Sequence, residues 1–184
     1  MDETSFLSRT KNTKVVALKG SENVWSKSIS ASFHLSVVAC GSASGHVIPP
    51  LFILPGQRFP SNLIDCCYVA GARGTCTDSG FINRATLLRR VEMFSNSVPN
   101  SVPCPILLLF DGYLSHLSID LVEMGETLGT QFVCFPANAT HLVQPLDIAV
   151  FSAFKKTIRA MARTHMMDTG KFIHCNSLFI LPTL

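Results

Sequence analysis

The sequence lacks several features that would assign a protein to a class at once. None of its seven cysteines forms a Cys-x-x-Cys pair, so the usual signature of a zinc knuckle is absent. No apolar run approaches the roughly 18 to 20 residues of a membrane span, and the polar, acidic start predicts no secretory signal. No block of Lys or Arg dominates the net charge of +3, so composition permits nucleic-acid contact without requiring it.

What the sequence does contain is enough apolar material for one domain. Its 184 residues are 47% hydrophobic and 15% charged, which predicts a single domain with one sizeable core. Without a secretory signal, an odd number of cysteines predicts reduced thiols rather than a disulfide framework. We therefore expect a soluble intracellular domain in which Cys40, Cys104 and Cys134 pack as small core residues.

The first half of the chain predicts a β-hairpin. Residues 5–32 are polar and aperiodic, which predicts a loop or an irregular hairpin. Two apolar runs, 34–40 and 46–54, then flank a Gly/Ser turn, the pattern of two antiparallel strands. Because proline cannot donate to a ladder, Pro49–Pro50 should place a bulge or an edge in the second strand. Residues 55–79 carry Pro, Gly and Asp and predict mostly loop.

The second half predicts alternating helices and strands. Apolar residues at helical spacing predict helices over 81–96, 117–128 and 146–164. Short apolar runs predict strands at 106–110 and 131–135, the first of them buried on both faces. The strand–helix–strand order between them argues for parallel pairing with a right-handed crossover. We therefore predict an α/β fold with helices packed on a mixed sheet.

Three aspartates stand in distinctive local settings. Asp111 ends the predicted buried strand, at the carboxyl edge where α/β folds place ligand sites. Asp147 lies in the first turn of the last helix, where the helix dipole favours an anion. Asp2 opens the segment M-D-E-T-S-F. Carboxylates that converge at a sheet edge can hold two Mg²⁺ or Mn²⁺ ions about 3.5 to 4 Å apart for phosphodiester cleavage. The alternative is that each acid only caps a turn or a helix.

The motifs around these acids resemble a known family. LLLFDGYLSH, then FVCFPANATHLVQPLDIAVF followed by FKK, is similar to the DDE superfamily endonuclease domain of pogo/Tigger-type transposases, which centromere protein B and jerky-type proteins share. The hairpin ACGSASGHVIPPLFILPGQ and the start M-D-E-T-S-F resemble the family's hairpin and its M-D-E-T-G-F. The resemblance runs from residue 1 to about 160, so we expect a family domain over 1–164 and a tail outside it at 165–184.

The resemblance implies an RNase H-like mixed sheet flanked by helices, with Asp2, Asp111 and Asp147 as the catalytic, metal-binding triad. It implies Mg²⁺- or Mn²⁺-dependent cleavage and strand transfer of DNA at transposon ends in the nucleus; it is compatible with a homo-oligomer and involves no membrane. In this fold the first acid lies on a central strand, and since only Met1 precedes Asp2, we expect most of that strand to be lacking. A catalytically inactive remnant, or a domesticated DNA-binding or interaction protein, stays open as the alternative.

Single positions match the family's pattern or depart from it. Three of them differ from the family's residues: Tyr113, Ala137 and Ala139. Ser5 takes a glycine position, which would be strained if the backbone there needs φ > 0. His116 and His141 match the motif. We expect their side chains to fix loops by hydrogen bonds to the backbone; the alternative is that one of them transfers a proton or orients a ligand. The side-chain amide of Gln144 is predicted to hold its loop in place.

Overall fold

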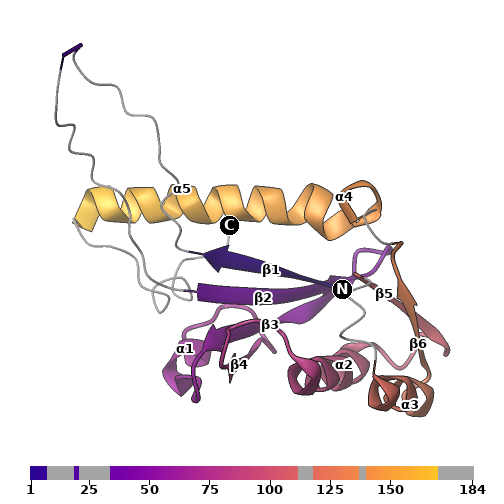
Figure 1. Cartoon of the computed structure of the whole chain (residues 1–184). Helices are drawn as coiled ribbons and strands as arrows, with labels where there is room; N and C mark the ends of the chain where they lie inside the picture. Colours follow the sequence, from indigo (N-terminus) through magenta and orange to yellow (C-terminus); the bar gives the residue numbers. More distant parts are fainter. Residues whose placement is uncertain (8–18, 21–33, 112–117, 137–139, 170–184) are drawn as a thin grey trace.

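Two groups of strands with helices on either side of them form the core of the protein (Figure 1). A computed structural model describes residues 1–7, 19–20, 34–111, 118–136 and 140–169. Its elements in chain order are β1 (Asp2–Leu7), β2 (His34–Gly41), β3 (Val47–Pro55), α1 (Ser61–Asp65), β4 (Arg73–Thr77), α2 (Arg84–Ser97), β5 (Ile106–Phe110), α3 (Ile119–Thr127), β6 (Thr130–Cys134), α4 (Thr140–Val143), the π-helical segment η2 (Leu146–Phe151) and α5 (Ser152–Thr169).

The first strand is present and begins at Asp2. β1 pairs antiparallel with β2, and Asp2 lies opposite Ala39. The expectation that most of this strand would be lacking is thus corrected, because six strand residues follow from Asp2, into the region predicted as loop. β1 occupies the edge of a four-stranded sheet in the order β1-β2-β3-β4 rather than a central position. Ser5 lies in the ladder opposite Ser36, so its backbone is extended and needs no positive φ.

β2 and β3 form the predicted antiparallel hairpin. Val38 pairs with Leu51 but Cys40 pairs with Ile48, so the register shifts by one residue between them. β3 therefore contains one extra residue at Pro49–Pro50, which is a β-bulge. The prediction that the two prolines would disturb this strand is confirmed, since a bulge is a place where a strand tolerates the missing N–H.

The segment predicted as mostly loop contains a helix and a strand. α1 buries Leu63, and β4 extends the sheet by pairing in parallel with β3. The strand passes so close to Phe59 that a Cβ at Gly74 would overlap the ring. Five-residue elements of this kind carry little periodicity of their own, and the pairing with β3 comes from outside the segment.

β5 and β6 form a separate parallel pair joined through α3, as predicted for the strand–helix–strand segment. The prediction that β5 is buried on both faces is wrong. Leu108 and Phe110 are buried, but Leu107 is 53% and Leu109 39% exposed. A helix covers one face of the β5–β6 pair. Because successive side chains of a strand point to opposite faces, such cover gives an alternating pattern of buried and exposed residues.

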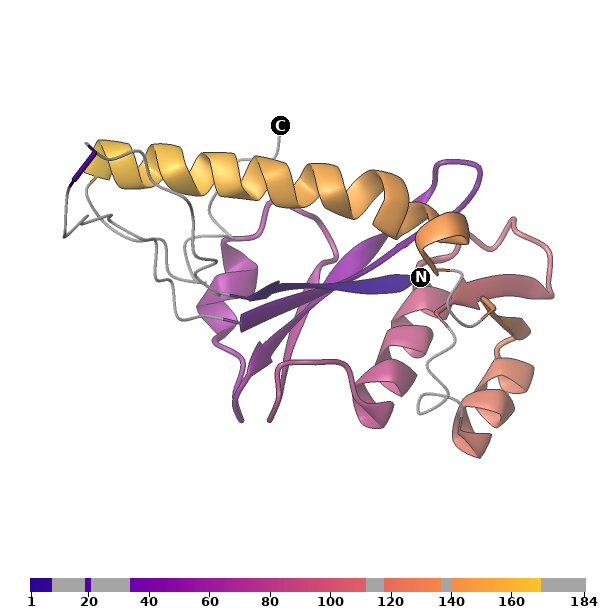
Figure 2. The same cartoon turned by 45° about the horizontal axis from the view of Figure 1, so that its top comes forward.

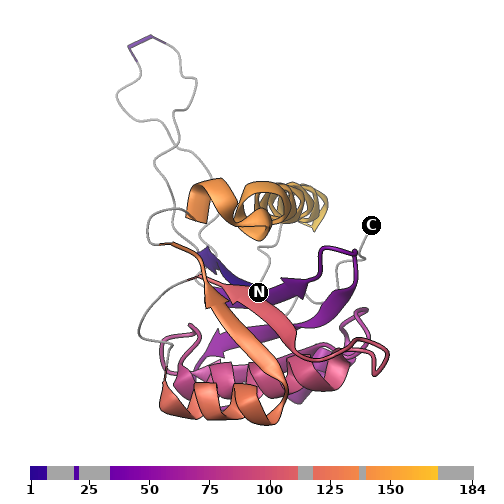
Figure 3. The same cartoon turned by 90° about the vertical axis from the view of Figure 1, so that its right-hand side faces the viewer.

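Helices lie on both sides of the larger sheet. α5 runs along one face above β1 and β2, whereas α2 and α3 lie on the opposite side (Figures 1 and 3). The Phe154 ring of α5 packs edge-on against Phe6 of β1, with ring centroids 5.5 Å apart. The predicted last helix is confirmed; it starts with η2 and continues across residue 164 to Thr169 (Figure 2). No helix of the described residues is long and apolar enough to cross a membrane.

One hydrophobic cluster extends across both groups of strands. Its buried members come from β2, β3, α2, β5 and α3: Cys40, Ile48, Leu87, Val91, Phe94, Leu108, Phe110 and Leu121. Arg90 of α2 is also fully buried, and its Nη1 donates to the carbonyl oxygen of Pro49 at 2.7 Å, which fastens α2 to the bulge of β3. Cys40 is the core cysteine that was predicted, and Cys134 is half-buried and packs against this core; Cys104 is exposed, which corrects the prediction for that residue.

Candidate functional site

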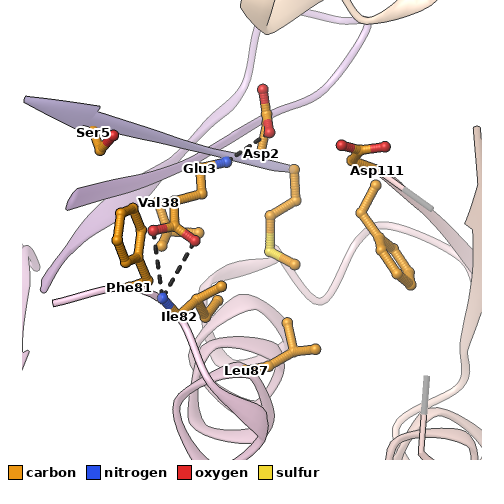
Figure 4. Close-up of a pocket in the computed structure, with 10 residues that line it drawn as sticks. Asp2, Glu3, Ser5, Val38, Phe81, Ile82, Leu87 and Asp111 are labelled. Atoms are coloured by element: carbon orange, nitrogen blue, oxygen red, sulfur yellow. Dashed lines mark hydrogen bonds between the residues drawn. The ribbon is translucent and has the colours of Figure 1, made fainter. Parts of the chain in front are cut away.

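The side chain of Asp2 lies at the start of β1, partly shielded from solvent. Its Oδ1 accepts a hydrogen bond of 2.7 Å from the N–H of Glu3, while its Oδ2 is buried and has no hydrogen-bond partner among the described residues. Neighbouring side chains of a strand point to opposite faces. Glu3 accordingly turns away from Asp2 and accepts from the N–H of Ile82 at 3.3 Å (Figure 4).

Asp111 follows β5 directly and lines the same pocket as Asp2. The pocket has a volume of about 450 Å³ and lies where β1 meets β5. The amino group of Met1 donates to the carbonyl oxygen of Leu109 at 2.7 Å, which ties the start of β1 to β5. Figure 4 shows the two carboxyl groups on one side of the pocket and the apolar side chain of Leu87 on the other. The structure therefore brings Asp2 and Asp111 together.

The negative charge of Asp147 acts on the carboxyl group of Asp2. It lies exposed in η2, which contacts β1. The pKa of Asp2 is raised from 3.8 to about 6, first by burial and second by the negative charge of Asp147. The N–H of Glu3 and the amide of Gln144 act against this rise. Asp147 is thus within electrostatic range of Asp2, although it does not line the pocket.

Gln144 has a different place from the one predicted for it. Its side chain is 1% exposed, and both of its amide atoms lack a hydrogen-bond partner among the described residues. The prediction of a loop-fixing amide is therefore wrong for the side chain; only its backbone carbonyl fixes local structure, by accepting from the N–H of Ile148 at 3.1 Å. Sequence reasoning also missed Glu3, for which the strand alternation after Asp2 was the available signal.

The donor atoms at this site fit a hard divalent cation. Asp2 offers a buried carboxylate oxygen with no other partner, and Asp111 presents a second carboxylate to the same pocket. Oxygen donors of this kind suit Mg²⁺ or Mn²⁺. Within the part of the chain that the structure describes, no three His, Cys, Asp or Glu side chains stand close enough to hold one ion together.

Asp111 also acts on a neighbouring thiol. Cys134 ends β6 beside β5, and burial raises the pKa of its thiol, with the charge of Asp111 as a second cause. Of the remaining motif residues, His141 falls in α4. The others lie outside the described residues: Tyr113, His116, Ala137 and Ala139.

Comparison with known proteins gives one family and a few distant relatives. The family model for the DDE superfamily endonuclease matches residues 34–178. Among curated proteins, the chain is 27% identical over 135 residues to an MFS-type transporter clz9 of Cochliobolus lunatus, covering 71% of this chain and 15% of that protein. It is 24% identical over 119 residues to the human Pogo transposable element with KRAB domain, covering 64% of this chain and 19% of the relative. The chain thus spans less than a fifth of these relatives.

Two solved structures share the fold. One is a crystal structure of the Mos1 strand transfer complex, with a TM-score of 0.56 and 16% identity over 85% of this chain and 39% of that one. The other is a pre-cleavage Mos1 transpososome, with a TM-score of 0.56 and 13% identity over 97% of this chain and 49% of that one. The predicted RNase H-like class, a mixed sheet flanked by helices, is confirmed by these neighbours.

Proposed function

The chain belongs to the DDE superfamily endonuclease family, and from this premise we propose that it cleaves phosphodiester bonds of DNA with Mg²⁺ or Mn²⁺ bound by Asp2, Asp111 and Asp147. The observation that carries the proposal is the pocket shared by Asp2 and Asp111, with the charge of Asp147 felt at Asp2. The charges of Asp2 and Asp147 oppose each other at a partly buried carboxyl group, and a bound cation would relieve this repulsion.

The chain's own groups have distinct roles in this proposal. Oδ1 of Asp2 is fixed by the N–H of Glu3, so Oδ2 is left to bind an ion. Asp111 binds from the end of β5, and Asp147 completes the ligand set from η2. Bound divalent ions supply neutralisation of the phosphate and activation of a water molecule or a 3′-hydroxyl as nucleophile.

One flank of α5 supports DNA as the substrate. The helix carries four basic residues and one acid, a surplus of three that equals the net charge of the whole chain. At about 100° per residue, the four basic residues fall within an arc of about 100°. They are Lys155, Lys156, Arg159 and Arg163. None of them forms an ion pair with another described residue. We call this surface the α5 basic flank, and its chemistry fits a phosphate backbone.

The proposed cleavage is tested by nicking of supercoiled plasmid DNA with and without Mg²⁺ or Mn²⁺. We expect metal-dependent nicking that Asp111→Asn and Asp147→Asn each reduce by at least about 100-fold, since each removes a charged ligand. Asp120→Asn is the matched control, because this exposed acid pairs with Arg84 and does not line the pocket. Nicking that persists unchanged in both site variants would exclude the proposed chemistry.

A second candidate function is DNA binding without cleavage. Two observations favour it: the α5 basic flank does not involve the acids, and the described residues contain no ready three-ligand cluster. In this case the chain binds labelled DNA in fluorescence anisotropy, Arg159→Ala and Arg163→Ala each weaken binding and lower its salt dependence, and Asp111→Asn has no effect. Binding of this kind with no nicking by the unaltered chain would select the second candidate.

The proposal extends to the setting in which this chemistry takes place. We propose transposon ends as the DNA target, the nucleus as the compartment, and a homo-oligomer as the assembly. Light scattering with and without DNA measures the assembly, and imaging of a tagged chain in cells gives the compartment. A monomer in both conditions, or exclusion from the nucleus, contradicts the corresponding part.

A further inference from the structure

The buried amide of Gln144 lies beside an acid that has an unused oxygen. Nε2 and Oε1 of Gln144 lack a hydrogen-bond partner among the described residues, and so does Oδ2 of Asp2. Gln144 is 1% exposed, so its amide is out of contact with bulk solvent. Leaving a buried donor and acceptor unpaired is unfavourable for folding. The unpaired amide of Gln144 and the unpaired Oδ2 of Asp2 therefore indicate that the two side chains have a joint function.

The backbone holds Gln144 in a fixed place next to the acids. Its carbonyl oxygen accepts from the N–H of Ile148 at 3.1 Å, which fastens it to the segment that carries Asp147. η2 in turn contacts β1. Gln144 and Asp147 thus approach Asp2 from the same segment, and both side chains are close enough to act on its carboxyl group.

We propose that Gln144 is a positioning residue whose Nε2 donates to Oδ2 of Asp2 and, together with the Glu3 N–H on Oδ1, orients this carboxylate for a divalent ion. A carboxylate has about four lone-pair sites, so both oxygens can accept a hydrogen bond and still bind a cation. Partners of this kind fix the orientation of metal ligands and raise the affinity for the metal. The inference rests on the proposed function, because it assumes that Asp2 binds the ion.

The test compares Gln144→Met with the unaltered 184-residue chain. Methionine keeps the length of the side chain and removes both polar atoms. We expect the affinity for Mn²⁺, measured by electron paramagnetic resonance, to fall about 10- to 100-fold. The melting temperature without metal should change little, because methionine fills the same buried space with apolar contacts in place of one hydrogen bond. Leu142→Met, two residues earlier and 70% exposed, is the control that should change neither quantity.

A structural role for Gln144 gives the opposite pattern. A lower melting temperature with unchanged affinity for Mn²⁺ would overturn the inference. Asp111→Asn separates this failure from that of the proposed function. If Asp111→Asn weakens Mn²⁺ binding and Gln144→Met does not, Gln144 has no positioning role and the metal site stands. If the unaltered chain binds no Mn²⁺, the metal site and the role of Gln144 are both refuted.

Discussion

Removing the charge of Asp2 should stabilise the metal-free protein at neutral pH. The pKa of this carboxyl group is raised from 3.8 to about 6, first by burial and then by the charge of Asp147. A raised pKa means that the folded state holds the proton more tightly than the unfolded state, so ionisation opposes folding. Asp2→Asn keeps an oxygen that can accept from the N–H of Glu3 and removes only the charge.

The magnitude follows from the same shift. At 1.36 kcal/mol per pKa unit, the rise from 3.8 to about 6 corresponds to about 3 kcal/mol. Because the carboxyl group is only partly buried, solvent screening reduces this figure to roughly 1 to 2 kcal/mol. In the unaltered chain, the protonated Asp2 carboxyl group contributes this free energy of unfolding in full below pH 3.8. The contribution is lost as the pH rises to about 6 and the group ionises. Asp2→Asn should therefore be more stable by roughly 1 to 2 kcal/mol at neutral pH.

Urea unfolding in the presence of a chelator measures this difference. The unaltered chain and Asp2→Asn are compared at about pH 7.5 and about pH 4, and the stabilisation should be largest at the higher pH. Asp120→Asn serves as the control. Losing its exposed ion pair with Arg84 should lower the free energy of unfolding by about 1 kcal/mol or less and should not raise it. If Asp2→Asn lowers stability at pH 7.5, or raises it equally at both pH values, the assigned electrostatics are wrong.

Two further substitutions probe the packing behind the site. Leu108→Ala should destabilise the fold by about 2 to 5 kcal/mol in urea unfolding, whereas Leu107→Ala, 53% exposed on the same strand, should change it by less than about 0.5 kcal/mol. Similar losses for both leucines would contradict the burial of β5. Gly125→Ala should cost about 1 to 3 kcal/mol, because a Cβ would lie 2.7 Å from the carbonyl oxygen of Thr130. Glu123→Ala on the exposed side of α3 is its control, and equal melting temperatures would refute the close packing.

The elements that could be predicted from the sequence are those with a strong local pattern. The hairpin of β2 and β3 has two apolar runs around a Gly/Ser turn, and its bulge follows from two adjacent prolines. α1 and β4 were missed because five residues contain too little periodicity to separate a short element from loop. The exposure of Leu107 was missed because a continuous apolar run does not reveal which face has a cover.

The motif match singled out three acids but did not predict their surroundings. Which face of β1 carries Asp2 depends on the ladder with β2, and this ladder also turns Glu3 toward Ile82. The burial of Gln144 depends on how η2 packs on β1, a contact between residues more than a hundred positions apart. The one local signal for Gln144 was its position three residues before Asp147, about one helical turn away.

The relative position of the two pocket acids depends on packing more than on strand pairing. β1 and β5 belong to different hydrogen-bonded groups, and a 2.7 Å hydrogen bond from the amino group of Met1 to the carbonyl oxygen of Leu109 links their backbones. Phe110, next to Asp111, lies instead in the core cluster that also contains side chains of β2 and α2. Because dispersion contacts are individually weak and collectively strong, this cluster sets the position of β5 against the larger sheet. The distance between Asp2 and Asp111 should therefore respond to changes in the core, which makes metal affinity a sensitive measure of packing.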